Sequence, residues 1–547
     1  MTLSFTDKLG RKVEQLLHFR KVDSPFGFLF LEKVEKEGIE IPKSTFKLQK
    51  NSLISKWTQI KSIITIVNLF EPSNEDSINF VRAYLDRLGA LHDSPQFQFI
   101  QDQLRLLITP PNGHRFTKHT LILAAELFCI TPAGYRMLRN SKAICLPNEK
   151  RIKVLLARCT DDDNLGKLFE VLKAEQRLVN IIFDEVKLVG GTRFSAGHIH
   201  GYATNNLPET DVIAKTALAI EIVCHHGGLC YVLRVHPVAK LKGDEQHRML
   251  LEAISTVKKQ GGTVISLISD NAGTNVRTFK LMGGPGKITL EREGQVYLMF
   301  LAYDYVHLFK NIRNNWITEI SQQLKFTYNG KQYLACWSDV VSLYEEDRKT
   351  PTRLTRLTNT SVHPKPLQRQ SVPLVCQVFN DKTVAAFKSL KTTINCSEGT
   401  VIFIELITNW FKMMNIKDKY SCIRYRDELR EPWTFFSGSF EQLTKINEVI
   451  KSCQRNPGVK RNKTLTSPTG QAFVITTDTN ILAAQHLLTE HKFDYVLPAV
   501  MSSDPAEKFF GQTRQRMSGN FYIDIVDVMA VAKMQVLHQL LVRAVLS

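Results

Sequence analysis

Asn180-Ile181-Ile182-Phe183-Asp184-Glu185-Val186 is a short apolar run that ends in carboxylates. Four to eight apolar residues with β-branched members are typical of a buried strand. A second run of the same form, TVISLISD, extends from Thr263 to Asp270. A carboxylate at the end of a buried strand is costly unless it is paired or bound to a cation. The two runs therefore predict a partner or a cation beside Asp184 and Asp270.

Two apolar strands that each bring an aspartate to one end could build a two-metal site for phosphoryl transfer. Hard oxygen ligands suit Mg²⁺, and ions about 4 Å apart can hold both the attacking and the leaving oxygen. The alternative is that each aspartate only caps the turn or helix that follows its strand.

Length and composition predict a multidomain protein with a polyanionic partner. The chain has 547 residues, which suggests about three or four domains, and a formal net charge of +18. This excess of positive charge favours nucleic acid first and an anionic membrane surface second. No apolar stretch approaches the roughly 18 residues of a transmembrane helix. Residues 1–20 lack a signal-peptide core, and the ten cysteines form no CxxC pair, so we expect reduced thiols and no zinc site.

The first 165 residues predict two helical regions. Apolar patches at helical spacing within residues 51–110 predict helices, residues 1–50 show no motif, and residues 1–110 together form an expected N-terminal helical region to which we assign no role. Residues 111–165 contain two helix-like segments around Thr131-Pro132, an N-cap followed by proline. The second segment is basic and carries Arg136, Arg139 and Lys142. Two short helices with a tight turn allow a DNA-binding helix-turn-helix, although many helical hairpins have the same pattern.

Residues 170–318 change to a strand-rich pattern. Expected strands at 178–186, 198–202, 217–223 and 231–235 precede a helix over 243–259 and the strand that ends at Asp270. This order matches the first half of a ribonuclease-H-like α/β fold. In that fold the first and fourth strands are adjacent and parallel, which brings the two aspartates together.

The next segment, Asp304 to Trp316 (DYVHLFKNIRNNW), predicts a helix with a polar face. His307, Lys310 and Arg313 share that face, which could contact phosphates or could simply be solvated. Residues 319–490 are then long and mostly helical and predict an insertion domain.

A third acid appears in residues 491–547, within SSDPAEKFFGQTRQR (502–516). Asp504, Pro505 and Glu507 have the spacing of a helix start with a capping box. Glu507 on the first turn could also point towards the strand ends, and Arg514 follows two turns along the same face.

The order FDEV, SDNAGTN, DYVHLFKNIRNNW and SSDPAEKFFGQTRQR resembles the P-element transposases, including their THAP-containing vertebrate relatives. The third block resembles the family's D-x-x-H-L-x-K-x-x-R-N-N motif, and the fourth resembles E-x-x-F-x-x-x-R. The resemblance covers residues 110–530 and implies a cut-and-paste DNA transposase. Its ribonuclease-H-like domain would be interrupted by an insertion that binds guanine nucleotide.

By this resemblance, Asp184, Asp270 and Glu507 are the catalytic acids and bind Mg²⁺ or Mn²⁺. Arg356 occupies the position of a nucleotide-contacting lysine, and Asp504 that of an aspartate near the guanine base of GTP. The implied partners are transposon-end and target DNA and further copies of the chain, without a membrane. The implied DNA-contacting residues are Arg136, Arg139, Lys142, His307, Lys310, Arg313 and Arg514. The expected location is the nucleus.

Two departures from the family's pattern keep an alternative open. No THAP-type zinc motif is present near residue 1, and the chain ends soon after Val528. A Walker P-loop is also absent. The alternatives are a domesticated DNA-binding protein that no longer transposes and an assembly factor that depends on guanine nucleotide.

Overall fold

The structure is a computed structural model of the chain. It describes strands within residues 2–54 and, beyond them, residues 94–158, 163–195, 198–205, 211–292, 294–318, 322–454, 463–516 and 523–543. Two compact units divide the chain, Met1–Leu155 and Leu156–Ser547. Among the described helices, none is both long and apolar enough to cross a membrane.

The first unit begins with strands rather than the expected helices. They are β1 (Thr2–Thr6), β2 (Lys12–Lys21), β3 (Leu29–Lys36), β4 (Ile39–Glu40) and β5 (Leu53–Ile54), in the order β1-β2-β3-β4 with β5 on β3. The predicted helical region over residues 1–110 therefore needs correction. β2 pairs antiparallel with both β1 and β3, and the helical spacing behind the prediction lies after residue 54, beyond these strands. The helices expected at 55–93 lie outside the described residues.

The first unit contains the two helices predicted around Thr131-Pro132, together with two others. They are α3 (Pro95–Ile108), α4 (Lys118–Ile130), α5 (Pro132–Asn140) and α6 (Glu149–Arg158). Thr131 alone separates α4 from α5, and its side chain accepts a hydrogen bond from Gly134 N, as an N-cap does. Tyr135 is buried, donates to Pro147 O at 2.6 Å and meets Phe128 edge to face. A helical hairpin with one tight junction is thus present.

The second unit is built on a six-stranded sheet in the order β10-β9-β6-β11-β13-β12. The strands are β6 (Leu178–Lys187), β9 (Thr216–Cys224), β10 (Cys230–Val238), β11 (Thr263–Ser269), β12 (Gly286–Arg292) and β13 (Gln295–Tyr303). β6 pairs in parallel with β11 and antiparallel with β9. The predicted α/β ribonuclease-H-like fold is confirmed. The segment from His198 is the exception, because β8 (His198–His200) pairs only with β7 (Arg193–Ser195), outside this sheet.

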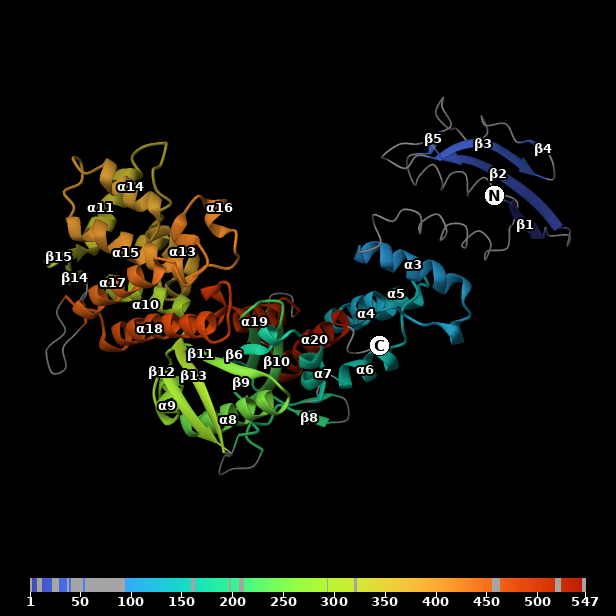
Figure 1. The fold of residues 1–547 in the computed structure, drawn as a ribbon, viewed down its shortest axis with the longest axis horizontal. Coiled ribbons are helices and arrows are strands. Elements are labelled where there is room, and N and C mark those ends of the chain that lie inside the picture. Colours follow the sequence, from blue (N-terminus) through green and yellow to red (C-terminus); the bar gives the residue numbers. More distant parts are fainter. Residues whose placement is uncertain are drawn as a thin grey trace. The chain divides into compact units, whose positions relative to one another are not determined.

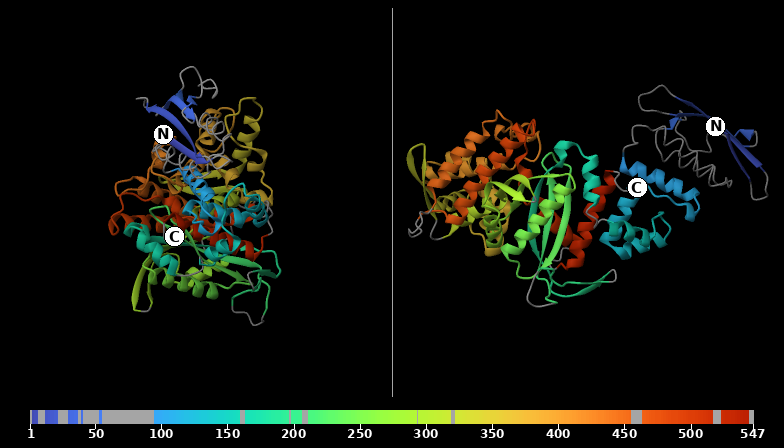
Figure 2. Two further views of the ribbon diagram at one scale, coloured as in Figure 1. Left: turned by 90° about the vertical axis from the view of Figure 1, so that its right-hand side faces the viewer. Right: turned by 60° about the horizontal axis from the view of Figure 1, so that its bottom comes forward.

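Helices cover both faces of the sheet (Figures 1 and 2). Successive side chains of a strand point to opposite faces. Phe183 meets Phe279 of α9 (Gly273–Leu281), on the face that also packs α8 (Gly243–Lys259). On the other face, Asn180 donates to Val500 O at 3.1 Å, close to α19 (Asp504–Arg516). A last helix, α20 (Ile525–Val542), packs along β10.

A helical insertion separates the sheet from α19. α10 (Tyr305–Ile317) leads into it, and α18 (Ser467–Thr489) returns along β12 and β13 (Figure 1). A hairpin opens the insertion, with strands β14 (Gln323–Tyr328) and β15 (Lys331–Cys336). The α-helices between are α11 (Trp337–Asp347), α12 (Asn359–Val362), α13 (Val372–Val378), α14 (Asp381–Ser389), α15 (Glu398–Met414), α16 (Ser421–Tyr425) and α17 (Ser439–Ser452).

Buried aromatic rings join the insertion to α10. Phe309 stacks on Phe411 of α15 with ring centroids 3.9 Å apart. Trp410 stacks on Phe473 of α18 at 4.2 Å, and both rings are fully buried. Aromatic side chains bury large apolar areas, so these contacts fix α10 between the sheet and the insertion. The start of α10 is thereby held at the edge of the sheet where the acids lie.

Candidate active site

Asp184 and Asp270 lie side by side at the ends of two parallel strands. Ile182 of β6 and Ile268 of β11 are register partners, and each aspartate follows two residues later. Equal spacing from a paired position brings both carboxylates to the same edge of the sheet. The geometry predicted from the two apolar runs is present.

Asp270 also caps the turn that follows its strand. Its Oδ1 accepts from Ala272 N at 2.9 Å and from Asn275 Nδ2 at 2.7 Å. Its Oδ2 faces His307 Nδ1 at 3.8 Å. Capping and site formation are therefore not exclusive, since one oxygen supports the turn and the other faces the cluster.

Asp304 joins the three segments that meet at this edge. Its backbone N donates to Ser269 O at 2.7 Å, beside Asp270. Its Oδ1 caps α10 by accepting from Val306 N at 3.0 Å, and its Oδ2 accepts from Ser503 Oγ at 2.6 Å. Ser503 directly precedes α19. One buried carboxylate thus fixes the end of β11, the start of α10 and the start of α19 relative to one another.

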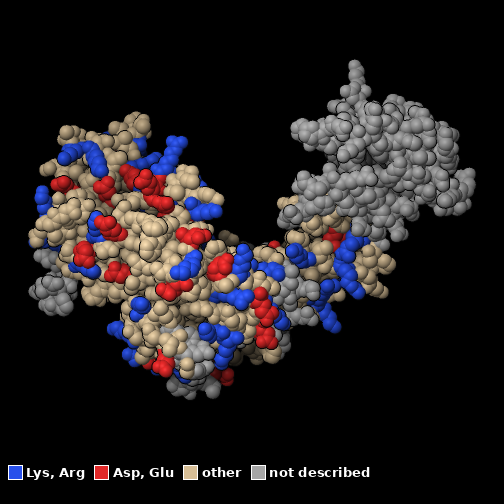
Figure 3. All heavy atoms as spheres, in the orientation of Figure 1, with Lys and Arg blue, Asp and Glu red and all other residues tan. Residues whose placement is uncertain are grey.

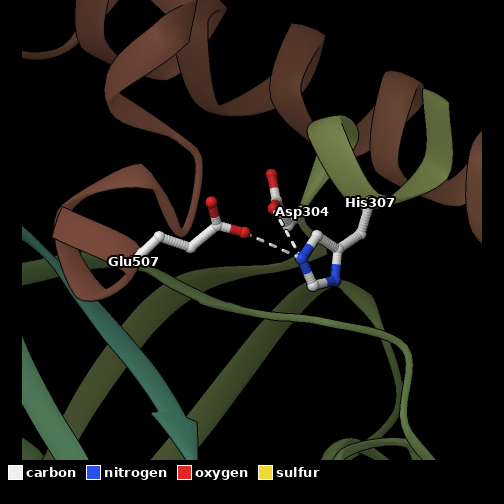
Figure 4. Close-up of side chains that lie close together, drawn as sticks. All are labelled: Asp304, His307 and Glu507. Atoms are coloured by element: carbon white, nitrogen blue, oxygen red, sulfur yellow. Dashed lines mark hydrogen bonds and ion pairs between the residues drawn. The ribbon is translucent and has the colours of Figure 1, made fainter. Parts of the chain in front are cut away.

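Glu507 enters the cluster from the first turn of α19. Its Oε1 lies 3.1 Å from His307 Nε2, and Asp304 Oδ2 lies 3.9 Å from the same nitrogen (Figure 4). His307 therefore stands between Glu507 on one side and Asp270 on the other. Asp304 and His307 lie within one turn of α10, three residues apart.

The carboxylates interact electrostatically. Burial and the charge of Asp270 raise the pKa of Asp184 to about 7, with a smaller contribution from Glu507. The hydrogen bond with His307 lowers the pKa of Glu507, and the positive charges of Lys310 and Arg514 assist. Asp184, Asp270 and Glu507 therefore share one electrostatic environment. Burial and repulsion from the neighbouring acids penalise the negative charge of Asp184. A divalent cation bound beside it would offset this penalty.

The pKa of His307 is raised, whereas the pKa of its partner Glu507 is lowered. Burial lowers its pKa, but the hydrogen bond with Glu507 and the charge of Asp304 raise it by more in sum. The imidazole is thus held as a partner of the surrounding carboxylates. The role predicted for His307 is a contact with DNA phosphate. In the structure its ring lies among the acids.

A fifth acid, Glu221, lies near Asp184 on the neighbouring strand. Glu221 on β9 is the register partner of Ile182 and is fully buried. Its Oε2 accepts from Cys230 Sγ at 3.5 Å, and its Oε1 has no partner among the described residues. Burial raises its pKa to about 7, and the charge of Asp184 adds to this. Glu221 is not among the predicted site residues. The feature that could have identified it is an isolated acid within the apolar run 217–224.

Glu221 predicts a pH dependence of stability in the metal-free protein. The folded-state pKa is raised from an ordinary value of 4.5 to about 7, so the folded form binds the proton more tightly than the unfolded form. Stability should therefore fall as the pH rises from about 4.5 to about 7, by at most roughly 1.4 kcal/mol per pH unit for this group. Glu221→Gln should remove this component. Urea denaturation between pH 5 and 7.5 measures it.

Asp244→Asn is the matched control, because Asp244 is exposed on α8 and, among the described residues, pairs only with Arg277. It should keep the wild-type pH slope. A Glu221→Gln variant with the same slope as wild type would show that Glu221 does not titrate in this range.

Of the two other DNA contacts predicted on α10, Arg313 needs correction. Arg313 is fully buried, and its Nη2 donates to Arg369 O at 3.0 Å, so it supports the insertion rather than facing solvent. Burial, with the charge of Arg369, lowers its pKa to about 10. Lys310 is buried near Glu507 and His307. The α10 face that looked solvated is covered because the insertion packs on it, and sequence spacing alone does not reveal this.

The two predicted nucleotide contacts are not joined in the structure. Asp504 does not cap α19 but is its first residue, and its Oδ2 forms an ion pair with Lys417 Nζ at 2.7 Å. Ser503 directly precedes α19, and its hydroxyl donates a hydrogen bond to Asp304. Arg356 is exposed, and no hydrogen bond or ion pair links it to Asp504 within the described residues.

The predicted contacts of the helical hairpin all lie at the surface. Arg136 donates to Pro132 O and lies 3.5 Å from Glu149. Arg139 and Lys142 are exposed and form no ion pair with described residues. Residues 94–158 carry ten Lys and Arg against three Asp and Glu, so this part of the first unit is strongly basic.

Comparisons with known proteins agree with this architecture. Residues 163–283 match the family model described as TNP-like, RNase H N-terminal domain, and residues 306–426 match TNP-like, GTP-binding insertion domain. No curated protein matches the chain. Among solved structures, the chain is similar to the Drosophila P element transposase strand transfer complex, with a TM-score of 0.64 and 17% identity over 82% of this chain and 98% of that chain. The resemblance to the P-element transposases is confirmed for these two domains and for the fold.

Proposed function

We propose that this chain, with its TNP-like RNase H and GTP-binding insertion domains, is a P-element-like cut-and-paste DNA transposase. The observation that carries the proposal is the convergence of Asp184, Asp270 and Glu507 from two strand ends and a distant helix. Two further properties support it. The overall charge is +18, and the helical hairpin before the catalytic domain is basic.

The three carboxylates fit a pair of divalent cations. Asp184, Asp270 and Glu507 offer hard oxygen ligands, and burial first, with the charge of Asp270 second, raises the pKa of Asp184. When bound, Mg²⁺ or Mn²⁺ would lower the pKa of a water or a DNA 3′-hydroxyl and stabilise charge on the scissile phosphate. The metal-binding assignment of these three residues rests on their chemistry and on their position at the sheet edge.

The protein's own groups would orient the carboxylates. Asn275 and the N–H of Ala272 hold one oxygen of Asp270, and the N–H of Glu185 holds Asp184 Oδ1 at 2.8 Å. Held carboxylates lose little freedom on binding a ligand, which is the basis of preorganisation. Lys310 and Arg514 add positive charge beside Glu507, where a DNA phosphate would lie.

Nicking of supercoiled plasmid DNA by the purified full chain tests the activity. Cleavage that requires Mg²⁺ or Mn²⁺ and stops with a chelator supports a transposase. Salt-dependent DNA binding without any nicking would instead support a domesticated DNA-binding protein. We further propose a nuclear location and a homo-oligomer that brings two DNA ends together.

Guanine nucleotide is the second ligand that we propose. The carboxylate of Asp504 would accept from the ring N–H and the exocyclic amine of guanine, and adenine lacks this donor pair. Arg356 would contact phosphate, with a planar fork in place of the compact charge of a lysine. Asp504 pairs with Lys417, so its side chain is already held near the start of α19.

GTP and GDP should bind in preference to ATP, and Asp504→Ala should erode this preference. Two donors left unpaired in a buried site cost about 1–3 kcal/mol, or roughly a five- to 150-fold loss of GTP affinity. ATP affinity should change little. Calorimetry with GTP, GDP and ATP measures both effects, and Asp494→Ala, an exposed aspartate after α18, is the control. Equal affinities for GTP and ATP in the wild type would contradict a guanine site.

A further inference from the structure

The cluster of Asp304, His307 and Glu507 has a geometry that three carboxylates alone do not provide. His307 Nε2 lies 3.1 Å from Glu507 Oε1 and 3.9 Å from Asp304 Oδ2, and all three atoms lie within 4.8 Å of one another. Figure 4 shows the three side chains converging from the start of α10 and the first turn of α19. One ligand atom is nitrogen, and two are carboxylate oxygens.

We propose that Asp304, His307 and Glu507 bind one divalent transition-metal ion, of the Mn²⁺, Co²⁺ or Zn²⁺ class. The inference rests on the proposed function only in that Glu507 is shared between this position and the one formed by Asp184 and Asp270. It adds a nitrogen ligand and a buried aspartate that the acid triad does not include.

The distances suit a single ion. Metal–ligand bonds to imidazole and carboxylate are about 2.0–2.2 Å, which separates neighbouring ligand atoms by roughly 3–4 Å. The two measured separations from His307 Nε2 lie in that range. Only small side-chain adjustments are needed to place an ion between the three atoms.

The surroundings of His307 favour Nε2 as the coordinating atom. A metal-bound histidine usually directs its other ring nitrogen to a carboxylate, which fixes the tautomer. Asp270 Oδ2 faces Nδ1 at 3.8 Å, so a slight approach would make this contact. The carboxylate that would orient His307 is that of Asp270, which also belongs to the neighbouring metal position. The two metal positions are therefore coupled.

Asp304 retains the capacity to coordinate. A carboxylate has about four lone-pair sites, and Asp304 uses one on each oxygen, for Val306 N and for Ser503 Oγ. Its side chain is almost completely buried, and among the described residues only His307 lies within ion-pairing distance of it. An ion bound here would neutralise a carboxylate that burial otherwise penalises.

The ligand set predicts the preference for metal. Mg²⁺ prefers all-oxygen octahedral sites, whereas imidazole with carboxylates suits Mn²⁺, Zn²⁺ and similar ions. The position shared by Glu507 should therefore bind a transition metal more tightly than Mg²⁺. The position formed by Asp184 and Asp270 consists of oxygen ligands and should accept either.

Pulsed electron paramagnetic resonance of the full chain with Mn²⁺, without DNA, tests the site directly. Wild type should show ¹⁴N modulation from a coordinated imidazole. His307→Gln should lose this signal and weaken Mn²⁺ binding at one position about tenfold or more, while Mg²⁺ binding changes by less than about threefold. His363→Gln, an exposed histidine of the insertion, is the control and should keep the ¹⁴N signal.

Asp304→Asn supplies a second variant that should still fold. Asparagine caps helices as well as aspartate: its Oδ1 can accept from Val306 N, and its Nδ2 can donate to Ser503 Oγ. It should retain the ¹⁴N modulation of His307 but weaken Mn²⁺ binding. Absence of ¹⁴N modulation in wild type, or its persistence in His307→Gln, would overturn the proposal. Nitrogen coordination without plasmid nicking would refute the proposed function alone, and nicking without nitrogen coordination would refute this inference alone.

Discussion

Asp184→Asn, Asp270→Asn and Glu507→Gln should each abolish DNA nicking and strand transfer while leaving the chain folded. Each change replaces one charged metal ligand by a neutral amide of the same shape. Metal ions contribute several kcal/mol to transition-state stabilisation. At about 1.4 kcal/mol per tenfold, each variant should lose at least about 10³-fold in rate. Plasmid nicking and oligonucleotide strand transfer with Mg²⁺ or Mn²⁺ measure the loss.

Asp184→Asn should increase the stability of the folded protein although it abolishes activity. Burial and the charge of Asp270 penalise the ionised Asp184. Its replacement should therefore stabilise the metal-free protein at neutral pH. Asp244→Asn, which lies outside the cluster on α8, should retain wild-type nicking. Near wild-type nicking by any one of the three acid variants would disprove the assignment of that residue.

DNA affinity should fall steeply with salt. Each phosphate neutralised by the protein contributes a slope of about −0.9 in log K against log salt, so about six contacts would cost roughly 10³-fold between 50 and 200 mM. The basic helices of residues 94–158 are the expected contact. On the face shown in Figure 3, lysines and arginines of the second unit are interspersed with acids. Residues 94–158, with ten cations and three acids, offer a stronger local field.

Arg139→Ala and Lys142→Ala should each make the slope shallower by about one phosphate contact. Both side chains are exposed and form no ion pair with described residues, so the fold should not change. Arg277→Ala on α9, whose guanidinium pairs with Asp244, is the matched control and should keep the slope. Fluorescence anisotropy over a salt series measures these values. A flat salt response of the wild type would argue against DNA as the partner.

The sequence by itself determined the strands that carry the acids. Apolar runs around Ile182 and Ile268 make buried strands in almost any context, and the residue that ends each run is readable directly. Thr131 and Pro132 likewise set the junction of α4 and α5 through local hydrogen bonding and a fixed φ. The motif order added the expectation that Glu507 joins the two aspartates. These features depend on neighbours along the chain.

Only the tertiary structure decided which polar residues face one another. His307 and Arg313 have the same sequence signature on α10, yet one meets Glu507 and the other is buried against the insertion. Asp304 only marks the start of a predicted polar helix in the sequence, and its bond to Ser503 joins segments almost 200 residues apart. Glu221 lies opposite Ile182 through a strand pairing that no local pattern identifies. Burial and charge pairing arise from packing between distant segments, and they determine the pKa values and metal preference of this site.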